Sequence, residues 1–268
     1  MNAIPTLFVS HGSPLLALED GPARRFLGEL GKQLPRPSAI LAVSAHWQDR
    51  RPTVSFADQP ETIHDFGGFP DALYQLHYPV PGAPALAEET ANLLEKAGFE
   101  VGHNLSRGLD HGAWAPLRLM YPAGEIPVTQ LALLHGAGPR EHYELGAALR
   151  PLHAQGVLIV GSGSMTHNLY RLMGNDGAES APRWVSEFAE WIAARLRTGD
   201  IEALLDYRRQ APHAADNHPT EEHLLPLFVA LGAAGEDAIA RRLHASYTYG
   251  VLAMDAYAFD GSDEETVV

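Results

Sequence analysis

The amino-acid sequence predicts a single α/β domain with a central, mostly parallel sheet flanked by helices. Short apolar, β-branched runs recur along the chain, small or polar residues end each run, and helix-like stretches separate them. Continuous apolar runs of this length are typical of strands buried on both faces, as in parallel sheets. Strands that alternate with helices are typical of an α/β fold. The four expected strands span residues 5–10, 39–44, 128–133 and 156–160.

Helices are expected between the strands, where apolar residues recur at helical spacing. The clearest of them spans residues 83–97 and is followed by Gly98, a residue suited to ending a helix. Apolar residues recur at a similar spacing in three further stretches, where helices are also expected. These stretches span residues 140–153, 184–197 and 221–232.

The chain is expected to fold as one domain over residues 1–268. With 46% hydrophobic and 19% charged residues, a chain of this length can bury a sizeable core. Residues 62–81 and 175–182 match neither helix nor strand, and long loops of this kind often carry function. The acidic tail at 260–268 is expected to fray.

The charge balance and the lack of long apolar runs exclude several classes of partner. The chain has 19 Lys and Arg against 33 Asp and Glu, a net charge of −14, which predicts neither a nucleic-acid partner nor an anionic membrane surface. No apolar run reaches the roughly 20 residues that span a bilayer. The N-terminus has no secretory signal pattern, so a cytoplasmic protein is expected. The sequence leaves the oligomeric state open.

Histidine is abundant and cysteine is absent, with 14 His and no Cys. Without cysteine the chain cannot form disulfides, iron–sulfur clusters or thiolate zinc sites. A metal site or an acid–base centre would therefore consist of histidines and carboxylates. The segment GSGS at 161–164 fits neither a nucleotide-binding loop nor the nucleophile elbow of α/β-hydrolases.

Three histidines follow expected strands closely. His11 comes directly after the first strand, His46 after the second, and His167 after the strand that ends near residue 160. The carboxyl ends of parallel strands share one edge of a sheet, where ligands of open α/β folds bind. Because neutral imidazole is the commonest metal ligand in proteins, these three side chains are candidate metal ligands.

Glu222 and His223 add a fourth candidate position. They are expected in the first turns of a helix that starts near Pro219. Adjacent residues on a helix point about 100° apart, so only one of the two would face a metal. The other would face solvent or a neighbouring side chain, and a carboxylate in a first helical turn is also an ordinary stabilising feature.

Two further polar segments interrupt apolar surroundings. In the first, Asp110 either orients His111 for acid–base catalysis or forms an ordinary turn with the glycine that follows. In the second, His64, Asp65 and Phe66 lie in the aromatic loop at 62–81 and are candidates for the wall of an aromatic-binding pocket.

Six motifs carry these candidates in a fixed order along the chain. They are HGSP at 11–14, SAHW at 44–47, TIHDFGGFP at 62–70, DHGAW at 110–114, THNL at 166–169 and PTEEHLLPL at 219–227. In this order they resemble the motifs of the 4,5-DOPA dioxygenase-like members of the class III extradiol ring-opening dioxygenases. The resemblance covers nearly the whole chain; it is specific for the family and not for the substrate.

The resemblance implies a site for one divalent metal, Fe(II) in active dioxygenases and often zinc in bacterial relatives. By motif, His11 and His46 correspond to metal ligands, and His167 and His223 complete the site in DOPA dioxygenase-like members. The wider superfamily uses two histidines and one glutamate. That pattern would make Glu222 the ligand in place of His223, with His167 acting beside the metal.

The resemblance also implies the reaction. His111 corresponds to the acid–base histidine, and His111 or His167 would move the proton of a bound catechol. With O2, the ring would open next to the diol and give a semialdehyde. Two alternatives use the same histidines: a zinc-dependent hydrolase, and a metal-binding module without catalysis.

Overall fold

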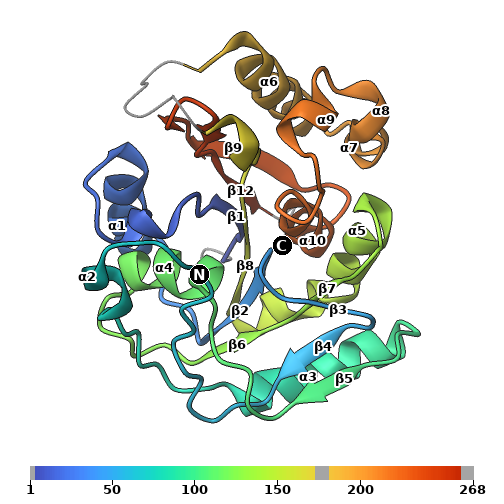
Figure 1. Cartoon of the computed structure of the whole chain (residues 1–268). Helices are drawn as coiled ribbons and strands as arrows, with labels where there is room; N and C mark the ends of the chain where they lie inside the picture. Colours follow the sequence, from blue (N-terminus) through green and yellow to red (C-terminus); the bar gives the residue numbers. More distant parts are fainter. Residues whose placement is uncertain (1–3, 173–180, 261–268) are drawn as a thin grey trace.

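A six-stranded sheet forms the centre of the computed structural model, which describes residues 4–172 and 181–260. Its strands are β1 (Thr6–Ser10), β2 (Ala39–Ser44), β6 (Val128–Gln130), β8 (Val157–Gly163), β9 (Ile239–His244) and β12 (Ala256–Asp260). They lie in the order β6-β2-β8-β1-β12-β9 (Figure 1). The first four are parallel, whereas β12 and β9 are antiparallel to their neighbours. The predicted mostly parallel sheet is confirmed; the sequence did not predict the antiparallel edge.

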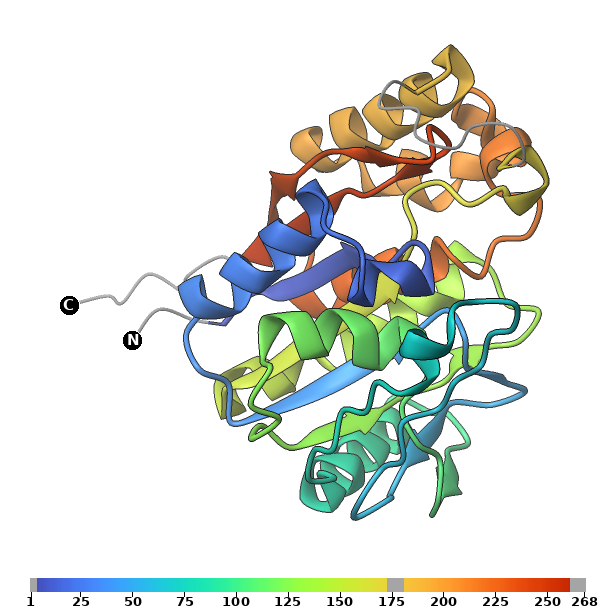
Figure 2. The same cartoon turned by 60° about the vertical axis from the view of Figure 1, so that its left-hand side comes forward.

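Helices pack on both faces of this sheet. On one face α10 (Leu225–Ala234) lies over β8 and β1 and packs against α5 (Pro139–Ala148). On the other face lie α1 (Pro22–Gln33) and α4 (His111–Met120), as Figure 2 shows. Successive strand residues point into the two cores in turn, as the pleat of a strand requires. The fold is thus one α/β domain with helices flanking the sheet.

The remaining elements are short or lie at the periphery. The helices are η1 (Pro14–Ala17), α2 (Asp71–Tyr74), α3 (Pro84–Lys96), η2 (Arg150–Gln155), η3 (Leu169–Arg171), α6 (Arg183–Thr198), α7 (Ile201–Leu205), α8 (Tyr207–Gln210) and α9 (Ala214–Asn217). The strands are β3 (Gln48–Asp49), β4 (Thr53–Ser55), β5 (Gly102–Asn104), β7 (Leu133–Leu134), β10 (Tyr247–Thr248) and β11 (Leu252–Ala253). Within residues 4–172 and 181–260, every helix is too short or too polar to span a bilayer.

Two predicted elements are shorter than expected. The strand expected at 128–133 ends at Gln130, and β7 then pairs with β3 in a separate two-stranded sheet. The helix expected at 140–153 ends at Ala148 and continues as the 3-10 helix η2, which has Pro151 in its first turn. Proline has no N–H to give to an α-helical hydrogen bond, so it interrupts the longer helix.

The helix expected at 221–232 begins later in the structure. α10 starts at Leu225 with Pro226 in its first turn, a position where the missing N–H of proline costs nothing. Glu222 and His223 therefore lie in the turn before the helix and not in its first turns. The directions of these two side chains are therefore not fixed by the 100° spacing of adjacent residues on a helix.

The two unassigned segments and the tail are described only in part. Residues 62–81 form an irregular loop with the short helix α2, and residues 181–182 precede α6. Asp260 is the last residue of β12 and pairs with Arg241, so it belongs to the sheet and does not fray. The rest of the predicted tail, and residues 175–180, lie outside the described residues.

Candidate metal centre

The end of β8 holds the candidate histidines in place through its backbone. The N–H of His11 donates to the carbonyl of Gly163 at 2.8 Å, and the N–H of Ser164 donates to the carbonyl of His223 at 2.8 Å. On the other side, the N–H of Ala45 donates to the carbonyl of Ser162 at 3.0 Å, which fixes the turn before His46. As predicted, strand ends at one edge of the sheet bring His11 and His46 together. The third histidine of the group is His223, from the turn before α10, and not His167.

The glycines of the GSGS segment allow this close approach. A Cβ at Gly163 would lie 2.1 Å from the carbonyl oxygen of His223, and one at Gly161 would lie 2.2 Å from that of Pro226. Real Cβ atoms do not approach backbone atoms so closely. The segment therefore serves to seat the start of α10, with His223, against the sheet.

Three imidazoles meet at this edge with their side-chain nitrogens close together. The candidate ligand atoms of His11, His46 and His223 all lie within 4.8 Å of one another, and the Nε2 atoms of His11 and His46 are 3.0 Å apart. His11 and His223 are buried, and the side chain of His46 is 23% exposed. The group is thus enclosed on most sides and open at His46.

Hydrogen bonds fix the tautomer of His11. The hydroxyl of Ser162 donates its hydrogen to the carbonyl of Gly112, so its oxygen accepts from Nδ1 of His11, 3.0 Å away. With the proton on Nδ1, Nε2 of His11 carries a lone pair.

Carboxylates favour the same tautomer in the other two rings. Nδ1 of His223 lies 3.0 Å from Oε1 of Glu222, and Nδ1 of His46 lies 3.4 Å from Oδ2 of Asp65. A carboxylate can only accept, which favours the proton on each Nδ1 and leaves a lone pair on each Nε2. Nε2 of His223 is buried and has no hydrogen-bond partner in the described part of the chain.

The environment keeps these rings neutral. Burial, followed by the neighbouring histidines, lowers the pKa of His11 and of His223 well below the usual value. Burial and then the charge of His111 lower the pKa of His46 to about 4, although nearby carboxylates act in the opposite direction. Neutral imidazoles with lone pairs are what a divalent metal requires of histidine ligands.

These observations fit a divalent metal. Nε2 of His11 lies 3.0 Å from Nε2 of His46, and the ligand atoms of all three histidines form one group. Within the described residues the buried Nε2 of His223 has no partner, which is unfavourable in the absence of a cation. Nitrogen ligands with nearby carboxylates suit zinc and non-haem iron. The histidine-rich site therefore supports a single divalent metal.

His111 lies beside the three histidines and is oriented by Asp65. Its Nδ1 is 3.0 Å from both carboxylate oxygens of Asp65, and its backbone N–H donates to the same carboxylate at 2.9 Å. Burial acts to raise the pKa of Asp65, but the hydrogen bonds and charge of His111 outweigh it and lower the pKa to about 2. The ring of His46 is 4.0 Å from that of His111, between centroids.

The expectation that Asp110 orients His111 is wrong. Asp110 is fully buried and caps the N-terminus of α4, where its carboxylate accepts from the N–H of Ala113. It also accepts from Ser44 at 2.6 Å, Arg107 at 2.9 Å and Gln130 at 2.7 Å. Adjacent side chains point in different directions from the start of a helix, so Asp110 points into the protein while His111 faces Asp65.

His167 lies on the far side of His223. The two rings are stacked, with centroids 3.4 Å apart and an interplanar angle of 9°. A nitrogen of His167 lies within 4.8 Å of ligand atoms of Glu222 and His223, but His167 does not share a ligand group with His11 and His46. Burial is the main cause that lowers the pKa of His167, to about 4.

A cavity of about 690 Å³ opens onto these side chains, a size typical of small-molecule sites. Asp65 and Phe66 line it, as predicted, but His64 does not: its Nε2 donates to the carbonyl of Leu76 and its ring packs edge-on against Phe66. The lining residues are Gly12, Ser13, Pro14, Leu15, Glu19, His46, Asp65, Phe66, Phe69, His111, His167, Leu169, Leu172, His223, Tyr249 and Leu252.

Comparison with known proteins identifies the family. A family model described as the catalytic LigB subunit of aromatic ring-opening dioxygenase matches residues 5–259. The chain belongs to this dioxygenase family. The predicted family resemblance and fold are therefore confirmed, and neither the hydrolase nor the inactive metal-binding module is favoured.

Named relatives agree with the family assignment. The chain is 43% identical over 266 residues to a 4,5-DOPA dioxygenase extradiol of Beta vulgaris, covering 96% of this chain and 97% of the relative. It is 42% identical over 233 residues to a protein of that name from Escherichia coli K12, covering 86% and 85%. A crystal structure of an uncharacterized Escherichia coli K12 protein matches with a TM-score of 0.81 and 33% identity, covering 95% of this chain and 99% of that one.

Sequence reasoning missed the contributions of Ser162 and Gly112 to this dioxygenase site, and it named Glu222 only as a rival ligand. Ser162 accepts a hydrogen bond from Nδ1 of His11 and so orients that ring. Gly112 lies where His11 and His46 approach α4. Glu222 accepts a hydrogen bond from Nδ1 of His223. A Cβ at Gly112 would lie 2.3 Å from Oγ of Ser44. The only signal for Ser162 in the sequence is its position two residues after the end of an expected parallel strand.

Proposed function

We propose that the chain opens the aromatic ring of a catechol with a DOPA-like side chain, using O2 and one divalent metal, to give a semialdehyde. The observation that carries the proposal is the group of three neutral histidines, His11, His46 and His223, beside the His111–Asp65 pair. All of these residues except His11 line one cavity. Family membership and the names of the relatives support the catechol and O2 as substrates.

We infer that His11, His46 and His223 hold the metal. Their ligand atoms form one group, and Glu222 is not part of it. The carboxylate of Glu222 instead accepts from Nδ1 of His223, a contact that orients the ring and strengthens it as a ligand. This assignment favours His223 over Glu222 as the third ligand.

The metal is proposed to be Fe(II) in the working enzyme. When bound, Fe(II) would supply both a Lewis acid for the catechol oxygens and the electron chemistry that O2 requires. Sites made of nitrogen and oxygen ligands bind Zn²⁺ more tightly than Fe²⁺ in general, so zinc competes for the same histidines.

His111 is proposed to take the phenolic proton of the catechol. Its Nδ1–H donates to Asp65, so the lone pair on Nε2 is available to the substrate in the cavity. The negative charge of Asp65 stabilises the imidazolium that forms when Nε2 binds the proton. The proton can then return to the leaving oxygen during ring opening.

His167 is proposed to bind substrate or O2 beside the metal, not to ligate the metal. Its neutral ring lines the cavity and stacks on His223, which fixes its orientation. Phe66, Phe69 and Leu169 supply apolar walls for the catechol ring. These walls keep water from the reacting ring and hold its diol edge toward the histidines.

Anaerobic reconstitution tests the proposal. Metal-free protein is loaded with Fe(II) or with Zn(II), mixed with L-DOPA under argon, and then exposed to O2. We expect yellow semialdehyde absorbance and O2 uptake only with Fe(II). If Fe(II)-loaded protein consumes no O2 with L-DOPA or any other catechol tried, the proposed function is wrong. Product formed by the zinc protein without O2 would favour hydrolysis instead.

A further inference from the structure

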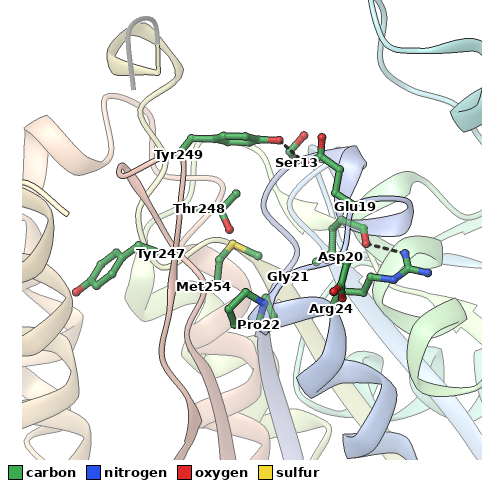
Figure 3. A pocket seen from close by; sticks show the side chains of 12 residues that line it. Ser13, Glu19, Asp20, Gly21, Pro22, Arg24, Tyr247, Thr248, Tyr249 and Met254 are labelled. Carbon is green, nitrogen blue, oxygen red and sulfur yellow. Dashed lines mark hydrogen bonds between the residues drawn. The ribbon is translucent and has the colours of Figure 1, made fainter. Parts of the chain in front are cut away.

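A second, smaller cavity of about 270 Å³ adjoins the catalytic cavity. Its walls come from the segment after β1 and from the β10–β11 hairpin (Figure 3). Ser13, Glu19 and Tyr249 line both cavities, so they form the junction between them. Because the junction belongs to the cavity that contains the histidines, a side chain on a bound catechol ring can extend toward it.

Glu19 brings a negative charge to this junction. The hydroxyl of Tyr249 donates to Oε2 of Glu19 at 3.0 Å, a contact with a neutral group. No residue in the described ranges 4–172 and 181–260 forms an ion pair with Glu19. Its carboxylate therefore offers an uncompensated charge to a cationic ligand.

Asp20 and Arg24, the other charged residues that line the smaller cavity, already form an ion pair or hydrogen bonds. Asp20 pairs with Arg25 at 2.6 Å, and Arg24 donates to the carbonyls of Leu16 and Ala17. Asp20 and Arg24 do not line the catalytic cavity. Of the charged residues of the smaller cavity, Glu19 is thus the one that also lines the catalytic cavity and lacks a counterion among the described residues.

The backbone of the hairpin positions Tyr249 for this contact. Tyr249 has a φ of 53°, a left-handed conformation that is unfavourable for residues with side chains. The turn continues with Gly250 at a φ of 68°. In Figure 3 the phenol of Tyr249 reaches across the junction toward Ser13 and Glu19, whereas Tyr247 points away from them.

We propose that Glu19, oriented by Tyr249, binds the ammonium group on the substrate's side chain and selects catechols with cationic side chains. The proposal rests on the proposed ring-opening function and concerns its specificity. The catechol oxygens would lie at the histidines while the ammonium lies at the junction. Charge attraction at Glu19 would favour amines and disfavour catechols whose side chain is only a carboxylate.

Anaerobic calorimetry with Fe(II)-loaded protein tests the proposal without turnover. Three probes share the catechol ring: L-DOPA, dopamine, which lacks the carboxylate, and 3-(3,4-dihydroxyphenyl)propanoate, which lacks the ammonium. We expect wild-type protein to bind both amines more tightly than the propanoate. Glu19→Gln should weaken binding of the two amines by about two- to fivefold, as expected for an exposed charged contact, and should not weaken binding of the propanoate.

Asp20→Asn is the matched control, since it removes a neighbouring carboxylate that is already paired with Arg25. It should leave all three affinities near wild type. In turnover with L-DOPA, Glu19→Gln should raise KM and leave kcat nearly unchanged. Equal amine affinities in Glu19→Gln and wild type would overturn the proposal even if ring opening occurs. Failure of ring opening with normal amine selectivity would refute the proposed function instead.

Discussion

The Nε2 atoms of His11 and His46 face each other at 3.0 Å, and the partners of both rings favour their protons on the opposite nitrogens. With both protons on Nδ1, neither Nε2 atom can donate to the other, and a cation bound by both would satisfy both lone pairs. Ser162 contacts Nδ1 of His11, and Asp65 lies near Nδ1 of His46. These two residues therefore orient the rings so that the Nε2 atoms face each other. The hydrogen-bonded surroundings of the histidines, and not the histidines alone, define this as a metal centre.

Removing a ligand should remove the metal. His11→Ala, His46→Ala and His223→Ala each delete one of the three converging nitrogens. Metal content after purification, measured by mass spectrometry, should fall to near background in each. His111→Ala should retain wild-type metal content and lose turnover, because His111 is proposed to handle the proton. Full metal content in all three ligand variants would contradict the assignment.

Ser162→Ala should weaken metal binding without removing a ligand. The variant deletes the acceptor for Nδ1 of His11, and loss of such an orienting contact lowers metal affinity by roughly 10- to 100-fold. Ser164→Ala is the control: it also deletes a buried hydroxyl, one that donates to the carbonyl of Thr166. Competition with a chelator measures both affinities, and equal losses would show that Ser162 acts only through general stability.

Asp65→Asn should slow turnover more than it weakens metal binding. The change keeps an acceptor for His111 but removes the negative charge that stabilises the protonated ring. We expect kcat with L-DOPA to fall by roughly 10- to 100-fold, less than the roughly 10²- to 10⁴-fold of a whole acid–base group, because His111 itself remains. Steady-state kinetics and metal analysis of the same preparation separate the two effects. Unchanged kcat would exclude the proposed role of Asp65.

Gly112→Ala should distort the site. The added Cβ would lie 2.3 Å from Oγ of Ser44 and 3.1 Å from Cε1 of His11, so neighbouring side chains must move. Metal affinity and melting temperature should both fall. Gly28→Ala is the matched control: Gly28 is also helical and has open space at its Cβ, where alanine favours the helix by roughly 1 kcal/mol. If the two variants have similar metal affinities and melting temperatures, the prediction of tight packing at Gly112 is wrong.

His218 should make the metal-free protein less stable in acid. Burial is the main cause that lowers the pKa of His218 to about 4 in the folded protein. In the unfolded chain the pKa of this histidine has its usual value of 6.5. Between these values the unfolded state binds more protons, so stability falls as the pH drops through 6.5 toward 4. From pH 7.5 to pH 5 this group should cost about 2 kcal/mol of unfolding free energy.

His218→Gln tests that contribution, because glutamine can still donate to the carbonyl of Met165, as Nε2 of His218 does. Urea unfolding in the presence of a chelator, at both pH values, should show a smaller acid loss in the variant. The same loss in wild type and variant would contradict a buried neutral His218.

The parts of the site that depend on sheet topology could be predicted from the sequence. His11 and His46 follow apolar strands directly, and parallel strands end at one edge, so their meeting follows from strand order. His223 and His111 were candidates from the residues themselves, and the family resemblance added their roles and the dioxygenase function. The predicted alternation of strand and helix also gave the correct fold class.

The remaining parts depend on tertiary contacts that no local pattern encodes. Asp65 reaches His111 only because the irregular loop at 62–81 folds back over the start of α4. Glu222 and Asp110 each sit next to a functional histidine, yet one orients its neighbour and the other does not, because local backbone direction decides this. The antiparallel strand β9 is polar and partly exposed, so it lacks the apolar run that marked the parallel strands. Strand β12 has four buried apolar residues, and the sequence reasoning did not assign them to a strand.

The location of the metal tests the central claim most directly. An anomalous difference map, recorded at the iron edge from crystals loaded anaerobically with Fe(II), locates the ion without reference to activity. We predict one peak per chain, bounded by the Nε2 atoms of His11, His46 and His223, with Glu222 at Nδ1 of His223. A peak bound by the carboxylate of Glu222 or by His167 in place of His223, or no peak among these histidines, would contradict the account.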